Sequence, residues 1–252
     1  MRKFGLIGFP LIHSFSKIYF TDKFEKEGID ASYGLYALED ISDFLVLKNK
    51  ADLCGLNVTI PYKEKIIPYL DELDQTAAEI GAVNVIQFIR RDGTLRFKGY
   101  NSDVIGFEKS ITPYLKPIHK KALILGTGGA SKAIDYVLRT LGIETTFVSR
   151  TPKPGILTYS QLSKEILSDN LLIINASPVG MYPHISECPA IPYQFLTPNH
   201  LLFDVVYNPY ETLFLNRGKE MGAIGLNGEN MLVGQAIAAW EIWNNELRTP
   251  GP

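Results

Sequence analysis

The segment 123–133, which reads LILGTGGASKA, limits the possible folds of this 252-residue chain more than any other stretch. Its glycines stand between the apolar run 122–126 and a segment with helical composition. A strand, a glycine turn and a helix in this order are typical of a dinucleotide site, because backbone N–H groups and the helix dipole favour a phosphate there. Gly126 permits a tight turn, and Gly128 lets a ligand approach the backbone. Ser131 takes the place of the third glycine of the usual G-x-G-x-x-G pattern, so the match depends on its structural context.

The strand after this turn indicates which dinucleotide binds. Proteins that bind NAD usually carry Asp or Glu at the end of that strand, where the carboxylate holds the ribose 2′-hydroxyl. Here the strand 145–149 is followed by Arg150 and has no carboxylate at its end. A guanidinium suits a 2′-phosphate, so we predict NADP as the cofactor. The alternative is an exposed arginine at a strand end.

Strand-like and helix-like apolar patterns alternate along the chain, which predicts an α/β protein with largely parallel sheets. The pattern restarts at Lys120, so we place a second domain from about residue 104. The tripeptide 91–93, Arg-Asp-Gly, predicts a tight hairpin turn. The predicted strands are 4–9, 32–37, 53–58, 83–89, 94–97, 122–126, 145–149, 171–175 and 201–206. The predicted helices are 16–27, 41–48, 62–70, 72–80, 103–115, the segment from the glycine turn to about 141, and 230–247.

The composition argues against several classes of partner. Hydrophobic residues make up 46% of the chain and charged residues 21%, which is usual for a globular protein. A formal charge of −2 and scattered basic residues give no reason to expect nucleic acid or an anionic membrane. Two cysteines and four dispersed histidines predict no metal site. We also find no membrane-spanning run and no signal peptide, so we expect a cytoplasmic protein.

Polar residues follow several of the predicted strands, where α/β proteins bind their ligands. In GLNVTIPYK, residues 55–63, an apolar strand ends in Thr59 and Lys63. Each candidate also has an ordinary structural explanation: the serines and the aspartate could cap helices, and the asparagine could complete a turn. Their shared position at strand ends favours a site in a crevice between the two domains. These candidates are Ser14, Ser16, Thr59, Lys63, Asn84 and Asp103.

The chain resembles the shikimate dehydrogenases in motifs that stand in the same order from Gly8 to Gln235. NVTIPYK and the Asn-x-Asp helix opening are specific to that superfamily, whereas the glycine turn is not. The resemblance implies an N-terminal substrate domain, an NADP-binding Rossmann domain, and a last helix that returns to the first domain. On this basis we expect a substrate domain at 1–103, completed by 230–252, and a cofactor domain at 104–229. The motifs are GFPLIHSFS, GLNVTIPYK, GAVN, GYNSDVIG, LGTGGASKA, NASPVGM, DVVYNP and NGENMLVGQ.

The resemblance also implies an activity, the reversible NADPH-dependent reduction of 3-dehydroshikimate to shikimate in aromatic amino-acid biosynthesis. Lys63 and Asp103 would be the catalytic pair. Ser14 and Ser16 would donate hydroxyl hydrogens to the substrate carboxylate, with Tyr207 beside them. Residues for the ring hydroxyls and the catalytic pair would be Thr59, Asn84 and Gln235. Cofactor residues would be Gly126, Thr127, Gly128, Gly129, Ala130, Ser149, Arg150, Thr151, Val205 and Gly228, the last at the nicotinamide end.

This chain departs from the family pattern in places. Lys17 follows the second serine, where relatives commonly have proline, and Asn227 replaces an acid before Gly228. Ser102 replaces a threonine and keeps its hydroxyl, and the nearest basic residue after Arg150 is Lys153. No catalytic group is lost. Two alternatives stay open: a quinate or dual quinate/shikimate dehydrogenase, which could use NAD, and a non-catalytic dinucleotide sensor. A monomer and a homodimer are both compatible with the sequence.

Overall fold

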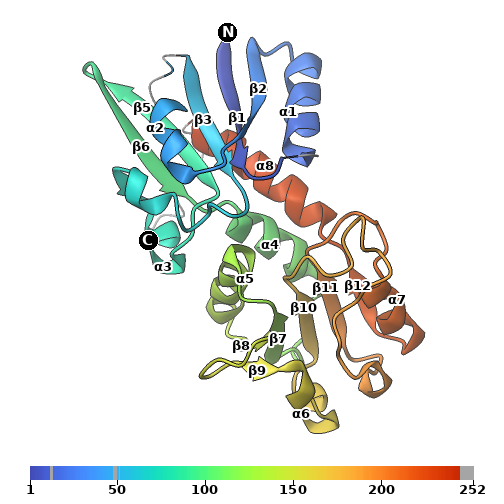
Figure 1. Cartoon of the computed structure of the whole chain (residues 1–252). Coiled ribbons are helices and arrows are strands. Elements are labelled where there is room, and N and C mark those ends of the chain that lie inside the picture. Colours follow the sequence, from blue (N-terminus) through green and yellow to red (C-terminus); the bar gives the residue numbers. More distant parts are fainter. Residues whose placement is uncertain (12–13, 48–49, 51, 245–252) are drawn as a thin grey trace. The chain divides into compact units, whose positions relative to one another are not determined.

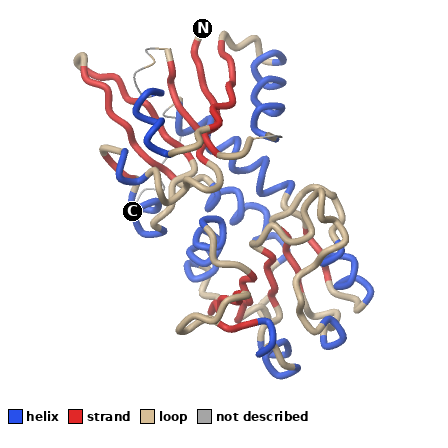
Figure 2. Tube along the Cα trace, in the orientation of Figure 1, coloured by secondary structure: helices blue, strands red, loops and turns tan. Residues whose placement is uncertain are grey.

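A computed structural model of the chain describes residues 1–11, 14–47, 50 and 52–244 (Figure 1). The chain forms two compact units. Unit 1 consists of Met1–Ser102 and the segment from Gln235 onward, and unit 2 consists of Asp103–Gly234. No helix within the described ranges is long and apolar enough to cross a membrane. Figure 2 shows the strands and helices of both units in one view.

Unit 1 contains a mixed six-stranded sheet in the order β2-β1-β3-β5-β6-β4. β1 pairs in parallel with β2 and β3, whereas β5 is antiparallel to β3 and β6. The predicted hairpin is confirmed: Arg91 pairs with Thr94, and Asp92 and Gly93 have φ of 52° and 73°, as a two-residue turn requires. The strands are β1 Arg2–Gly8, β2 Ala31–Ala37, β3 Leu53–Val58, β4 Glu72–Leu73, β5 Val85–Arg91 and β6 Thr94–Tyr100.

The helices of unit 1 correct two predictions. The predicted helix 62–70 is wrong, since that segment forms turns and the short 3-10 helix Ile67–Tyr69. Pro68 has no N–H to donate to the carbonyl four residues earlier, so an α-helix cannot continue there. The predicted helix 72–80 begins only at Gln75, because Glu72–Leu73 pairs with β6 as a strand. The α-helices are α1 Phe15–Lys26, α2 Phe44–Leu47, α3 Gln75–Ile80 and the later part of α8 Glu229–Trp243. Positions 48 and 245–247 of the predicted helices lie outside the described residues.

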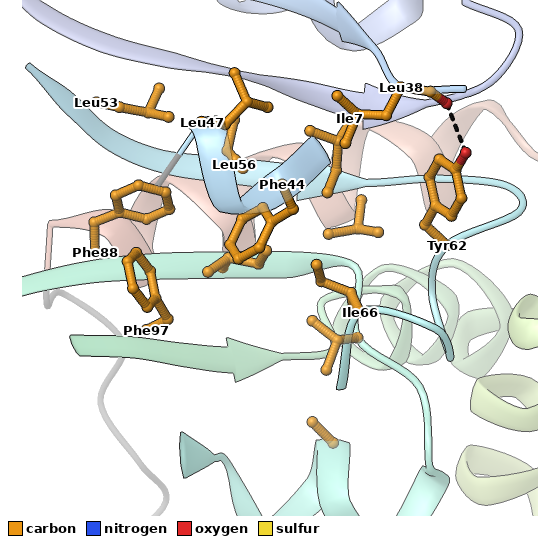
Figure 3. Close-up of a cluster of buried hydrophobic side chains, with 14 residues drawn as sticks. Ile7, Leu38, Phe44, Leu47, Leu53, Leu56, Tyr62, Ile66, Phe88 and Phe97 are labelled. Atoms are coloured by element: carbon orange, nitrogen blue, oxygen red, sulfur yellow. Dashed lines mark hydrogen bonds between the residues drawn. The ribbon is translucent and has the colours of Figure 1, made fainter. Parts of the chain in front are cut away.

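Both faces of the unit 1 sheet are buried against helices or loops. One cluster gathers the side chains of α2, β3, β5 and β6 (Figure 3). The other is rich in aromatic rings from α1, β1, β2 and α8, including Phe4, Phe20 and Trp243. Trp243 donates its indole N–H to the Ile86 carbonyl at 3.1 Å, and Gln87 Nε2 donates to the Ile242 carbonyl at 2.6 Å. The last helix therefore returns to the first unit from Gln235 onward, as the resemblance implied.

Unit 2 is a doubly wound sheet in the order β12-β11-β10-β7-β8-β9, and all its pairs are parallel. The order reverses between β7 and β10, which is where such folds bind nucleotides. The predicted α/β class is confirmed. Four short elements, β9, β12, α6 and α7, were not predicted. The elements are β7 Lys121–Leu125, β8 Glu144–Ser149, β9 Leu157–Thr158, β10 Leu172–Asn175, β11 Leu201–Asp204, β12 Ile224–Leu226, α4 Asp103–Ile111, α5 Gly129–Thr140, α6 Lys164–Asp169 and α7 Leu213–Glu220.

Candidate active site

The loop after β3 presents Thr59 and Lys63 from a fixed backbone. Thr59 N donates to the Ile7 carbonyl at 2.9 Å, and the Lys63 carbonyl accepts from Val83 N at 2.7 Å. Between them Tyr62 is buried and donates its hydroxyl to the Leu38 carbonyl at 2.6 Å (Figure 3). Because Tyr62 anchors the loop in the core, the partly exposed Thr59 and Lys63 side chains are held at its two ends.

Asn101 and Ser102, which precede Asp103, are hydrogen-bonded to the segment 82–84. Asn84 Oδ1 accepts from Ser102 N at 2.7 Å, and Asn84 Nδ2 donates to Ser102 Oγ at 3.1 Å. Asn101 Nδ2 donates to the Ala82 carbonyl at 2.9 Å. Gln235 Oε1 accepts from Ser102 Oγ at 3.5 Å, so Asn84 and Gln235 meet at one hydroxyl.

Asp103 follows this network directly. It is the first residue of α4, and its side chain is buried. A carboxylate in the first turn of a helix is stabilised by the helix dipole. Asp103 is counted with unit 2 and Lys63 with unit 1, so their pairing stays a prediction.

Ser14 and Ser16 stand at the start of α1 and differ in environment. Ser14 is the N-cap of the helix and accepts from Lys17 N at 3.2 Å, so its capping role is confirmed. Ser16 is buried. Lys17, the departure from the family pattern, donates its ammonium group to the Tyr33 carbonyl. Residues 12 and 13 of the serine motif lie outside the described residues.

The glycine turn of unit 2 has the form of a phosphate cradle. Gly126 has φ of 121°, and a Cβ there would lie 3.1 Å from the Ala176 carbonyl oxygen. Gly128 is the N-cap of α5, and a Cβ at this position would have nothing within 4 Å. No side chain caps α5, so its first N–H groups suit an anion. Ser131, which replaces the third glycine, is fully buried and donates to the Gly128 carbonyl at 2.6 Å. Thr127, Gly129 and Ala130 complete the turn.

The segment after β8 carries Arg150, the residue predicted to bind the 2′-phosphate. Ser149 Oγ accepts from Thr151 N at 3.2 Å, which shapes the turn that carries Arg150. Arg150 is exposed. Burial raises the pKa of Tyr159, and the Arg150 charge opposes that shift. The arrangement leaves the guanidinium accessible at the end of β8.

A buried carboxylate that the sequence analysis did not single out organises the ends of β10 and β11. Asp204 accepts from Thr212 Oγ1 at 2.6 Å, Asn175 Nδ2 at 2.9 Å and Val206 N at 3.0 Å. Burial raises the pKa of Asp204 to about 7, although these three donors act to lower it. A signal was present, because Asn175 and Asp204 are polar residues at the last positions of two apolar strands.

Three residues predicted to bind ligands follow Asp204 along the chain. Val205 N donates to the Asn175 carbonyl at 2.9 Å, and Gly228 N donates to the Val206 carbonyl at 3.3 Å. Tyr207 is partly exposed, and burial raises its pKa. Tyr207 lies in unit 2, so its predicted place beside Ser14 and Ser16 of unit 1 stays a prediction.

Asn227 fixes the backbone at the start of α8. Asn227 Nδ2 donates to the Tyr210 carbonyl at 3.0 Å, and its Oδ1 accepts from Glu229 N at 3.2 Å. The amide therefore caps α8 where relatives carry an acid. Among the described residues, no group of three or more His, Cys, Asp or Glu side chains is arranged to hold a metal ion.

Comparison with known proteins identifies the family of the chain. The family model described as shikimate dehydrogenase substrate binding domain matches residues 6–86. A shikimate dehydrogenase (NADP(+)) from Halothermothrix orenii is 39% identical over 264 residues, which cover 95% of this chain and 89% of the relative. The chain belongs to the shikimate dehydrogenase family.

Solved structures of the family have the same fold. Shikimate 5-dehydrogenase from Thermus thermophilus in complex with NADP(H) and shikimate matches with a TM-score of 0.84 at 28% identity. The match covers 99% of this chain and 96% of that one. Quinate dehydrogenase from Corynebacterium glutamicum in complex with NAD matches with a TM-score of 0.84 at 25% identity, covering 97% and 94%. Both substrate preferences therefore occur on this fold.

Proposed function

We propose that the protein catalyses the reversible NADPH-dependent reduction of 3-dehydroshikimate to shikimate, in the cytoplasm, as a step of aromatic amino-acid biosynthesis. One observation of the structure carries the proposal. The loop that holds Lys63 and the polypeptide that enters Asp103 are both bonded to residues 82–84, through Val83 N to the Lys63 carbonyl at 2.7 Å and through Asn84 to Ser102. Such anchoring supports a fixed Lys–Asp pair.

The choice of NADP as the cofactor is supported by the glycine turn before α5 and by Arg150 after β8. The open space over Gly128 and the uncapped start of α5 fit a pyrophosphate, and the accessible Arg150 fits a 2′-phosphate. We assign Gly126–Ala130, Ser149, Arg150 and Thr151 to this end of the cofactor. Val205 and Gly228 are assigned to the nicotinamide end. NADPH, when bound, supplies a hydride to the substrate.

The chain's own residues handle the proton. As the ketone carbon receives the hydride, negative charge develops on its oxygen, and the Lys63 ammonium stabilises that charge and donates a proton to the oxygen. The reverse reaction returns the proton to the amine. Asp103 accepts a hydrogen bond from the amine and orients it toward the oxygen.

The remaining polar residues bind the rest of the substrate. Ser14 and Ser16 hold the carboxylate, with Tyr207 beside them, while Thr59, Asn84 and Gln235 hydrogen-bond the ring hydroxyls. A site built from such groups rejects an analogue that leaves them unpaired. We assign substrate binding to residues 1–103 with 230–252, and cofactor binding to 104–229. The match of the substrate-domain family model to residues 6–86 supports this division. We keep a monomer or a homodimer as the expected state.

Lys63→Ala tests the mechanism. Loss of a group that acts in the transition state lowers kcat by roughly a hundredfold or more, while KM for shikimate changes little. Steady-state rates of NADP reduction with shikimate measure both constants. A rise in KM alone would make Lys63 a binding residue and remove its catalytic role. Lys65→Ala, two residues further along the same loop, is the matched control and keeps the wild-type kcat.

A quinate or dual-specificity dehydrogenase is the second candidate, because the quinate dehydrogenase has the same fold over nearly the whole chain. Quinate carries one more hydroxyl, on the carbon that bears the carboxylate. Nicotinamide absorbance with shikimate or quinate, each against NADP and NAD, separates the candidates. We expect the highest kcat/KM with shikimate and NADP. Equal rates with quinate would favour the dual enzyme, and no turnover of either acid would favour a dinucleotide sensor.

A further inference from the structure

Asn175 and Asp204 are register partners at the carboxyl ends of β10 and β11. Paired residues of neighbouring parallel strands have their side chains on the same face of the sheet, and here Asn175 Nδ2 donates to Asp204 Oδ1 at 2.9 Å. Both side chains are fully buried. The proposed mechanism uses neither of them, yet both lie at the end of the sheet where such folds bind nucleotides.

The side-chain amide of Asn175 has a fixed orientation, because both its oxygen and its nitrogen are fully used in hydrogen bonds. Its Oδ1 accepts from Ser177 N at 3.2 Å and from Ser177 Oγ at 2.6 Å. Its Nδ2 donates to the Val179 carbonyl at 3.1 Å and to Asp204. A flipped amide would point its N–H groups at the Ser177 N–H, so the group that Asn175 presents to Asp204 is a donor.

Asp204 passes this constraint to the segment that follows β11. Its Oδ1 receives the Asn175 donor and also accepts from Val206 N at 3.0 Å. The Val206 carbonyl in turn accepts from Gly228 N at 3.3 Å. One residue earlier, Val205 N donates to the Asn175 carbonyl at 2.9 Å. The Asn175–Asp204 pair therefore holds the backbone of residues 205–206, to which Gly228 is bonded.

We propose that the Asn175–Asp204 pair positions the nicotinamide for hydride transfer, and that it acts through the backbone of residues 205–206. β11 ends at Asp204, and the carboxylate holds the Val206 N–H just beyond the strand. Hydride transfer requires close alignment of the donor and acceptor carbons, so a displacement of about 1 Å can lower its rate roughly a hundredfold. The inference rests on the proposed function, which assigns Val205 and Gly228 to the nicotinamide end.

Two substitutions of Asp204 test this role. Asp204→Ala removes the acceptor of Val206 N. Asp204→Asn restores it, because the amide oxygen can replace Oδ1 while the amide nitrogen donates to the Thr212 hydroxyl, which can accept. Titration with 2′-phospho-ADP-ribose, which is NADP without its nicotinamide, counts the sites whose phosphate-binding part is intact.

The quantity that decides is kcat for shikimate oxidation per counted site. We expect it to fall about tenfold or more in Asp204→Ala and to return close to the wild-type value in Asp204→Asn. The affinity for 2′-phospho-ADP-ribose should stay unchanged in both variants. A purely structural role would instead reduce the number of counted sites and leave kcat per site unchanged.

Thr212→Val is the matched control, because Thr212 Oγ1 donates to Asp204 Oδ2 at 2.6 Å rather than to the Oδ1 that holds Val206. It should lower the melting temperature and leave kcat per counted site at the wild-type value. Asn175→Ala removes the donor to Oδ1 and should lower kcat per counted site as Asp204→Ala does. This second variant keeps the role testable if Asp204→Ala does not fold.

The outcomes separate this inference from the proposed function. A wild-type kcat per counted site in either folded Ala variant overturns the positioning role, and so does an equal fall in Thr212→Val. Either result leaves Asn175 and Asp204 as structural residues. Failure of the wild-type protein to oxidise shikimate would instead refute the proposed function.

Discussion

Gly228 lies directly against the backbone of Val205. A Cβ added to Gly228 would stand 2.2 Å from the Val205 carbonyl oxygen, which is far inside van der Waals contact. Val205 is in turn held by the Asn175 carbonyl, so its backbone has little room to shift. This contact brings two of the proposed nicotinamide residues together, and it leads to the first prediction.

Gly228→Ala should weaken both the fold of unit 2 and its cofactor site. The added methyl group must displace the Val205 backbone, a close overlap of the kind that costs roughly 1–3 kcal/mol of stability. We expect a lower melting temperature and an NADPH dissociation constant raised about tenfold or more, a change that corresponds to about 1.4 kcal/mol. Thermal unfolding and quenching of protein fluorescence by NADPH measure the two effects. A wild-type melting temperature together with a wild-type NADPH dissociation constant would show that the Val205 backbone shifts to accommodate the methyl group at little cost.

Gly128→Ala should separate cofactor binding from stability. A Cβ at this position meets nothing within 4 Å, so the melting temperature should stay at the wild-type value or rise slightly. The methyl group does, however, occupy the space over the uncapped end of α5, where we place the pyrophosphate. NADPH affinity should fall about tenfold. Unchanged affinity would place the phosphates elsewhere.

Arg150→Ala should weaken the binding of NADPH and leave the binding of NADH unchanged, because only NADPH carries the 2′-phosphate. Loss of a charge-assisted contact to phosphate corresponds to roughly 1.5–3 kcal/mol, or at least a tenfold change in affinity. Titration of both cofactors into the same variant provides the comparison, and Arg139→Ala, on α5 of the same unit, is a control for lost charge. Equal losses for NADPH and NADH would contradict a 2′-phosphate role.

Asp204 should make the stability of the protein depend on pH. Its folded pKa of about 7 lies above the ordinary value of 3.8, so the folded state holds this proton more tightly than the unfolded chain does. The stabilisation is present below about pH 4 and is lost as the pH rises through 7, at up to about 1.4 kcal/mol per pH unit. Relative to Asp204→Asn, the wild-type free energy of unfolding should fall across this range. A constant difference would show that Asp204 is ionised throughout.

Two buried histidines of unit 2 should act in the opposite direction. His119 Nδ1 accepts from Lys116 N and His200 Nδ1 accepts from Thr197 N, each at 3.0 Å. Burial lowers the pKa of both below the ordinary 6.5. The stability from the neutral rings is present above that value and is lost as the pH falls through the lowered pKa. His119→Asn should flatten the acid side of the unfolding profile, whereas the exposed His184→Asn should not.

The most reliable sequence predictions rest on local chemistry. Asp92 and Gly93 specify a two-residue turn by their tolerance of positive φ, and the hairpin forms as predicted. The glycine turn is equally local, because Gly126 needs its positive φ whatever surrounds it. Motif order identified the family for the same reason, since each motif is a short segment that can be read alone.

The errors and omissions depend on partners far away in the sequence. Glu72–Leu73 looked helical, but pairing with β6 makes it a strand. Tyr33 and Asn57 stand 24 positions apart, and Asn175 and Asp204 stand 29 apart, so no local pattern joins them. Such networks become visible only when the sheet register is known. The sequence could indicate Ser16 and Asn84 as candidates from their positions after strands, but not the hydrogen bonds between Asn84 and Ser102.

Helix α8 starts in unit 2 and finishes in unit 1, where Ala236, Ala239 and Trp243 fill the aromatic cluster. A ribosome completes the contiguous unit 2 before it releases these last core residues. We therefore expect unit 2 to fold during translation, while the aromatic cluster of unit 1 stays incomplete until residues 236–243 have left the ribosome. During that interval the nascent N-terminal half is a natural client for chaperones.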